Sequence, residues 1–66
     1  MATATILRCQ RRHPKGEVRI WYEYAPIIDG RPRRRPDHMM GSAESAAELA
    51  RRYGFNVDGE ILDVQL

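Results

Sequence analysis

The sequence predicts an α+β fold in which one α-helix packs on one face of a small antiparallel β-sheet, in the order ββ(β)αβ. Three observations predict it. β-branched and aromatic side chains recur at every second position from Val18 to Tyr24, which is typical of a half-buried strand. Apolar side chains recur at helical spacing between Ser42 and Gly54. The chain has 66 residues, enough for one hydrophobic core, so we expect residues 1–66 to form a single domain.

The first expected element is a β-hairpin that joins the segment from Thr5 to Arg11 to the strand after it. His13–Gly16 have turn chemistry, since proline fixes φ and glycine accepts positive φ. With these four residues as the loop, Arg12 lies opposite Glu17, and the face toward the helix receives Leu7, Cys9, Val18, Ile20, Tyr22 and Tyr24. The other face receives Arg8 opposite Trp21, Gln10 opposite Arg19 and Ile6 opposite Glu23.

The middle of the chain is expected to reverse direction at Asp29–Gly30, a pair that favours hairpin turns. Residues 31–36 then form either a third, edge strand or an extended loop. A central strand is excluded there because Pro32 and Pro36 cannot donate backbone hydrogen bonds.

The helix is expected to begin after Ser42, which suits the N-cap position. A capping box from Ser45 to Glu48 is the alternative start. Gly54 suits the position just beyond the last turn.

The C-terminal segment is expected to turn at Asp58–Gly59 and to end in a strand. Apolar and polar side chains alternate from Leu62 to Leu66, as they do in a strand with one buried face.

Charge is segregated along the chain. Residues 1–36 hold nine basic and three acidic side chains, whereas residues 37–66 hold two basic and six acidic ones. A chain with one strongly basic half suits a polyanion or an acidic protein surface as its partner. We therefore expect the partner to be nucleic acid or an acidic protein, with a homodimer also compatible with the sequence.

The cysteine and histidine content argues against a disulfide framework or a metal centre. Cys9 is the single cysteine, and neither His13 nor His38 has zinc-ligand spacing to it. An unpaired cysteine fits a reducing compartment, and the first residues carry neither a basic region nor a long apolar run. We expect a protein without cofactors or a membrane span, located in the cytoplasm of a bacterial or phage-infected host cell.

Candidate binding residues fall into two groups. The first surrounds Trp21 on the hairpin, where tryptophan and arginine side chains together can stack on bases and neutralise phosphates. The alternative to a binding role for Trp21 is that its indole packs only on Arg8, as a cross-strand pair within the protein. The second is the proline-bracketed arginine run, expected to be exposed and suited to bidentate contact with phosphates or carboxylates. The full set is Arg8, Arg11, Arg12, Arg19, Trp21, Arg31, Arg33, Arg34 and Arg35.

Catalysis is not expected. General acid–base chemistry needs a histidine positioned by a second group, and neither His13 nor His38 has a carboxylate or nucleophile at a suitable spacing. We expect no catalytic residue and no small-molecule substrate, and a small ribonuclease or toxin remains a remote alternative.

Two known families share patterns with the chain. Residues 18–53 combine a strand tryptophan, the Asp29–Gly30–Arg31 turn and a helix that contains Ser45–Glu48. This arrangement resembles the arm-type DNA-binding domain of phage integrases, which implies a sheet that reads DNA. The prolines in residues 31–36 and the extra C-terminal strand depart from that family. In size and charge segregation the chain also resembles phage-encoded inhibitors, anti-CRISPR proteins among them.

A third pattern is excluded by the sequence. Residues 46–55 are similar to the first helix and turn of a helix-turn-helix, but Asn56–Gly59 would break the recognition helix. The leading expectation is thus a non-enzymatic module that binds nucleic acid phosphates through its hairpin and arginine loop. The alternative is an inhibitor of phage or mobile-element type that binds a host protein or nucleoprotein through the same arginines.

Overall fold

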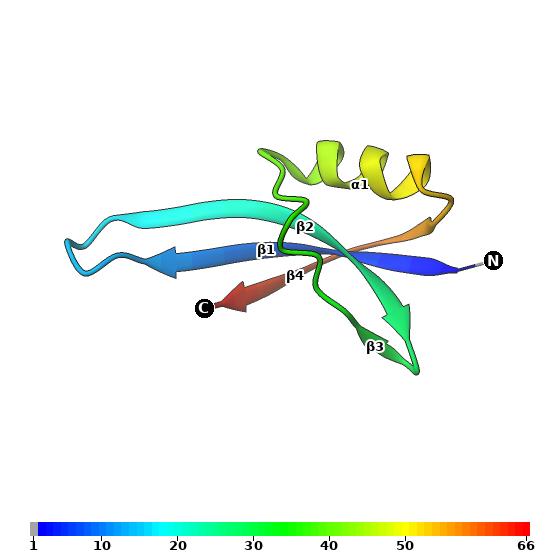
Figure 1. The fold of residues 1–66 in the computed structure, drawn as a ribbon, viewed down its shortest axis with the longest axis horizontal. Helices are drawn as coiled ribbons and strands as arrows, with labels where there is room; N and C mark the ends of the chain where they lie inside the picture. The colour runs from blue at the N-terminus through cyan, green and yellow to red at the C-terminus, as the bar shows by residue number, and fades with distance from the viewer. Residues whose placement is uncertain (1) are drawn as a thin grey trace.

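The computed structural model describes residues 2–66, which form four strands and one helix (Figure 1). Their bounds are β1 Thr3–Arg12, β2 Val18–Ile28, β3 Arg31–Pro32, α1 Ala43–Arg52 and β4 Asn56–Gln65. The strands make one sheet in the order β3-β2-β1-β4, and α1 covers part of one face. The predicted α+β class and the order ββ(β)αβ are confirmed.

The sheet is mixed, because the last strand runs parallel to the first. β1 pairs antiparallel with β2, but Thr3 lies opposite Asn56 and the two strands continue in the same direction. The sequence predicts an antiparallel sheet, and the pairing of β4 with β1 corrects that prediction. The difference arises because α1 returns the chain to the end of the sheet where β1 begins.

Asp58 and Gly59 form a bulge inside β4 and not a turn before it. Thr5 alone lies opposite Asp58–Glu60, and Gly59 takes φ 83°. The Asp58 carboxylate accepts hydrogen bonds from the Thr5 hydroxyl and the Glu60 backbone N–H. These contacts hold the extra residues against β1, so the strand continues through the glycine.

The expected register of the β1–β2 hairpin is wrong by one residue. The loop is three residues long, Pro14–Gly16, and is closed by hydrogen bonds from Gly16 N–H to His13 O (2.9 Å) and from His13 N–H to Glu17 O (2.8 Å). Gly16 has φ 90°, as in a type I turn followed by a glycine bulge. Arg12 therefore pairs with Val18 instead of Glu17. Shortening the loop from four residues to three shifts the pairing by one residue, and this shift moves every β1 side chain to the opposite face of the sheet relative to β2.

The shift changes which β1 side chains face the helix. Ile6 lies opposite Tyr24 and packs under α1, whereas Leu7 and Cys9 lie on the other face. The expectation that Leu7 and Cys9 face the helix, and that Ile6 faces away from it, was therefore wrong. The predicted faces of β2 are confirmed, because Tyr24 packs toward the helix and Trp21 packs on the opposite side of the sheet.

The predicted turn between β2 and β3 and the predicted ends of the helix are confirmed. Asp29 and Gly30 both have positive φ (53° and 77°) and join β2 to the short β3, after which residues 33–36 form a loop. Ser42 is the N-cap, and its hydroxyl accepts a hydrogen bond from Ser45 N–H at 3.1 Å. Gly54 follows the C-cap with φ 91°.

The core beneath the helix is small. Its buried members are Ala4, Ile6, Tyr24, Ala46 and Ala50. The hairpin extends past the end of α1 (Figure 1), and Val18 and Ile20, expected in the core, are 47% and 48% exposed. Tyr53, the C-cap of α1, is 59% exposed and stacks on His38.

Candidate functional site

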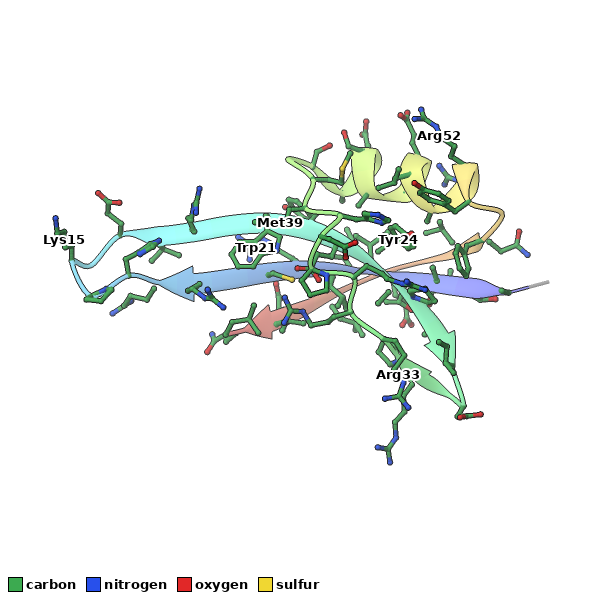
Figure 2. All side chains as sticks on the ribbon, viewed as in Figure 1. Lys15, Trp21, Tyr24, Arg33, Met39 and Arg52 are labelled. Carbon is green, nitrogen blue, oxygen red and sulfur yellow. The ribbon has the colours of Figure 1, made fainter. Side chains whose placement is uncertain are left out.

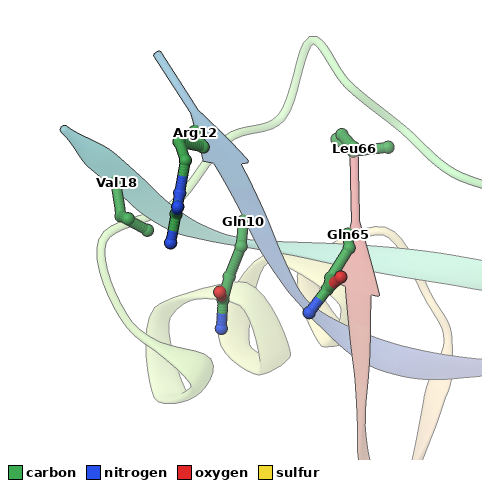
Figure 3. A pocket seen from close by; sticks show the side chains of 5 residues that line it. All are labelled: Gln10, Arg12, Val18, Gln65 and Leu66. Carbon is green, nitrogen blue, oxygen red and sulfur yellow. The ribbon is translucent and has the colours of Figure 1, made fainter. Parts of the chain in front are cut away.

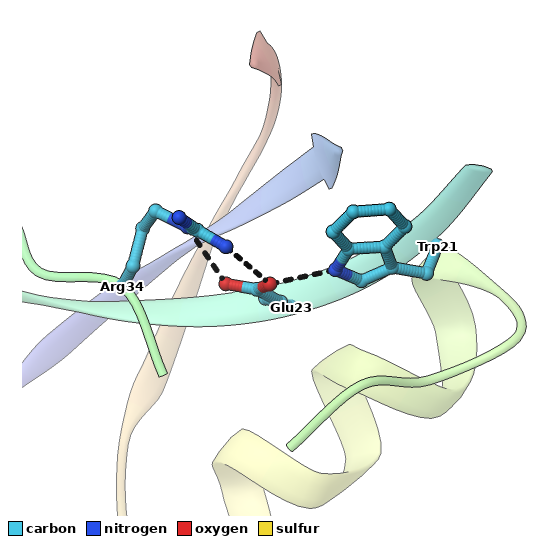
Figure 4. Close-up of polar contacts among 3 residues, drawn as sticks. All are labelled: Trp21, Glu23 and Arg34. Atoms are coloured by element: carbon cyan, nitrogen blue, oxygen red, sulfur yellow. Dashed lines mark hydrogen bonds and ion pairs between the residues drawn. The ribbon is translucent and has the colours of Figure 1, made fainter. Parts of the chain in front are cut away.

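A polar network lies on the face of the sheet opposite the helix (Figure 4). Glu23 on β2 is fully buried, and its carboxylate accepts hydrogen bonds from Arg34 Nε (3.2 Å), Arg34 Nη2 (2.9 Å) and Trp21 Nε1 (2.6 Å). Arg34 comes from the loop after β3 and reaches back over the sheet. The network therefore fixes both that loop and the indole.

The charges in this network compensate one another. Burial by itself raises the pKa of a carboxyl group, but the hydrogen bonds from Arg34 and Trp21 outweigh it and hold the pKa of Glu23 below its ordinary value. The same contact raises the pKa of Arg34. Glu23 and Arg34 thus form an ionised pair, and Arg34 is not the free surface cation that the sequence analysis expected.

A groove of about 250 Å³ opens beside this network. Trp21, Pro36 and Met39 give it apolar walls, and Arg11 and Arg19 carry its positive charge. The groove is lined by Arg11, His13, Arg19, Trp21, Glu23, Arg34, Pro36 and Met39.

Arg11 and Arg19 are directly opposite each other on β1 and β2. Both are exposed, and neither makes an ion pair within residues 2–66. Like charges in this position destabilise a sheet. Because Arg34 already neutralises Glu23, the groove carries a net positive charge.

The remaining predicted site residues lie elsewhere. Arg8, expected beside Trp21, lies opposite Tyr22 on the helix side and pairs with Asp63 at 3.2 Å. Its place opposite Trp21 is taken by Cys9. Gln10 also faces the helix side, so the patch of Arg8, Gln10, Arg19 and Trp21 does not form.

Arg12 lies in a second hollow, at the far end of the sheet on the helix side (Figure 3). Gln10, Val18, Gln65 and Leu66 complete its lining, and its volume is about 210 Å³. One cation among two amides and two apolar side chains gives this hollow much less positive charge than the Trp21 groove.

The other arginines of the loop are exposed. Arg31 belongs to β3, and Arg33 and Arg35 follow it without ion pairs within the described part of the chain. The Arg33 side chain extends away from the sheet, and Lys15 marks the tip of the hairpin (Figure 2). In the same view, Lys15 and Arg33 lie on opposite sides of Trp21 along the length of the molecule.

Beneath the network, Leu7, Cys9 and Ala25 form a second small cluster of buried side chains. Burial, reinforced by the nearby Glu23 carboxylate, raises the pKa of the Cys9 thiol. Cys9 is thus a buried packing residue, and Trp21 packs against its cluster.

Several groove residues were missed by sequence reasoning. The sequence predicts Glu23 on the outer face of the hairpin opposite Ile6, with no partner, and it assigns no binding role to Pro36 or Met39. A signal existed for Glu23, because a carboxylate on a strand between apolar neighbours needs a cationic partner when it is buried. Which arginine supplies that partner depends on the path of the loop.

The part of the chain that the structure describes holds no group of three or more His, Cys, Asp or Glu side chains arranged to bind a metal ion. Within residues 2–66, no helix has the length and apolar character to cross a membrane. Comparisons with protein-family models, curated proteins and solved structures find no match to this chain.

Proposed function

We propose that this protein binds nucleic acid, with phosphates held by the arginines of the Trp21 groove. The observation that carries the proposal is the Arg11–Arg19 pair, in which two exposed cations lie opposite each other beside a half-buried indole. A polyanion in the groove would offset their mutual repulsion, and phosphate oxygens suit guanidinium donors.

The charges around the groove support the same proposal. Arg33 on one side of Trp21 and Lys15 near the hairpin tip on the other would extend the contact along a phosphate backbone. The acidic side chains of β4 lie at the opposite edge of the sheet, beyond β1. A backbone that follows β2 and its loop therefore avoids them.

Salt dependence of binding tests the proposal. A labelled 20-nucleotide DNA of mixed sequence is titrated with the protein between 50 and 200 mM salt. Each phosphate contact contributes a slope of about −0.7 to −0.9 in log affinity against log salt. Three to five contacts predict a slope of roughly −2 to −4.5. Weak affinity without this slope would contradict the proposal and favour the protein-inhibitor alternative.

A matched pair of variants locates the site. Arg11→Ala with Arg19→Ala removes two charges from the groove, and Arg51→Ala with Arg52→Ala removes two from α1. The groove variant should lose tenfold or more in affinity and about 1.5 in slope, and the α1 variant should lose much less. Equal losses would show that net charge alone attracts the DNA.

A further inference from the structure

The indole of Trp21 is held in one orientation, and this suggests what the groove accepts. Its Nε1–H donates to Glu23, whose carboxylate also accepts two hydrogen bonds from Arg34. A side chain fixed by a buried acceptor loses little conformational entropy when a ligand packs against it. The indole is therefore a preformed surface for a ligand.

The groove has the size and composition for one flat ring. Its volume, about 250 Å³, falls below the roughly 300 to 1,000 Å³ of pockets for drug-sized ligands. Trp21, Pro36 and Met39 offer apolar contact, and Met39 is 50% exposed, so its side chain can pack on an incoming group. The cations lie beside these apolar walls, as the phosphate lies beside the base in a nucleotide.

We infer that the groove binds one unpaired base of a single-stranded nucleic acid, packed against Trp21, with the adjacent phosphates on Arg11 and Arg19. This inference rests on the proposed function. The indole lines a hollow and is tied to a buried carboxylate, so it does not project as a wedge that could enter a duplex. A base must come to Trp21, and a duplex would have to unpair and unstack it at a substantial cost.

The same network predicts weak base preference. Glu23 is fully buried, and its oxygens already accept three hydrogen bonds. It is therefore occupied within the protein and does not read the edge of a base. Stacking on an aromatic ring tolerates every base because each base has a π-face.

Three probes with equal phosphate counts per strand test the inference. They are a 12-nucleotide single-stranded DNA of mixed sequence, its blunt duplex, and a 12-unit abasic strand. Trp21 is the only tryptophan in the chain, so its fluorescence reports on the groove directly. The single strand should bind tenfold or more tighter than the abasic strand and quench the emission, which the abasic strand should leave unchanged. The duplex should bind more weakly than the single strand.

Variants of Trp21 provide a second test of the inference. Trp21→Ala should lower affinity for the single strand by about 5- to 100-fold while leaving the abasic affinity unchanged, and Trp21→Phe should retain most of the binding. Far-UV circular dichroism confirms that each variant is folded, and the abasic comparison on the native protein does not depend on any variant.

The outcomes separate the two proposals. Equal binding of all three probes with a normal salt slope and unchanged emission overturns the single-strand inference and leaves phosphate binding intact. No binding of any probe overturns the proposed function and this inference with it.

Discussion

Replacing Arg34 with alanine removes the guanidinium that neutralises a carboxylate buried from water. Glu23 is fully buried and Arg34 is 34% exposed at its side chain. In Arg34→Ala the carboxylate keeps the hydrogen bond from Trp21 but loses two charged donors. The neighbouring Arg33 has no such contact, so it provides a control with the same change of charge one residue away.

The expected cost follows from the burial of the pair. Removing one partner of a fully buried ion pair costs about 3–5 kcal/mol. Arg34 is partly exposed, and its removal lets water approach Glu23, so we expect a smaller loss of about 2 kcal/mol in the free energy of unfolding. For a domain of this size that corresponds to a fall in Tm of roughly 8–16 °C. Arg33→Ala should cost about 0.5 kcal/mol or less.

Thermal and urea denaturation followed by circular dichroism measure both variants. Adding Glu23→Gln to Arg34→Ala should recover part of the lost stability, since it removes the unpaired charge while keeping an acceptor for Trp21. Arg33→Ala and Arg34→Ala with indistinguishable melts would refute the reasoning, because Glu23 would then not depend on Arg34.

The pH dependence of this difference has a defined sign. In the native protein the lowered pKa of Glu23 contributes stability above its ordinary value, about 4.3, and that contribution is lost as the pH falls through the lowered value. In Arg34→Ala burial raises the pKa of the same carboxyl, so the destabilisation should be greatest at neutral pH and should diminish as acid protonates Glu23. A difference in Tm that grows from pH 7 to pH 4 would contradict the assignment.

Three further predictions concern other parts of the molecule. Arg11→Glu turns a like-charge cross-strand pair into an opposite-charge pair, so Tm should rise by a few degrees while affinity for DNA falls; a lower Tm with unchanged affinity would argue against the role given to Arg11 and Arg19. Ser42→Ala removes the N-cap of α1 and should cost about 1 kcal/mol, measured by urea denaturation. Cys9 should react slowly with a thiol reagent at pH 8 and rapidly once urea unfolds the chain, because the thiol is buried and its pKa is raised; fast reaction of the native protein would show that the cluster of Leu7, Cys9 and Ala25 is not closed to solvent.

Much of the fold follows from local chemistry that the sequence displays. The ends of the helix and one turn each depend on a few neighbouring residues. These are the Ser42 N-cap, Gly54 after the C-cap, and the positive-φ pair Asp29–Gly30. The helical spacing of apolar side chains between Ser42 and Gly54 was enough to identify α1. The segregation of arginines in the first half is likewise a property of the sequence alone.

The hairpin register shows where sequence reasoning failed. A loop of four residues and a loop of three use the same Pro14–Gly16 chemistry, but they place opposite sets of β1 side chains beneath the helix. The pattern of apolar and polar side chains along β1 did not decide between the two loop lengths. Ile6 and Leu7 are both apolar and both buried, one on each face of the sheet. The four-residue loop therefore places Arg8 on the face of Trp21, whereas the structure places Arg11 there, opposite Arg19.

The sequence by itself determined the α+β class, the order of elements, the two ends of the helix, the Asp29–Gly30 turn, and the tryptophan-bearing face of β2. Only the tertiary structure decided that Arg34, among four arginines in a run of six residues, neutralises Glu23, and that Arg11 faces Arg19. Helix caps and tight turns form hydrogen bonds with near neighbours in the chain, so their residues are visible in the sequence. The Arg11–Arg19 pair depends instead on the length of the hairpin loop, and the Glu23–Arg34 pair depends on the path of the loop after β3. Those choices are made by packing between residues distant in sequence.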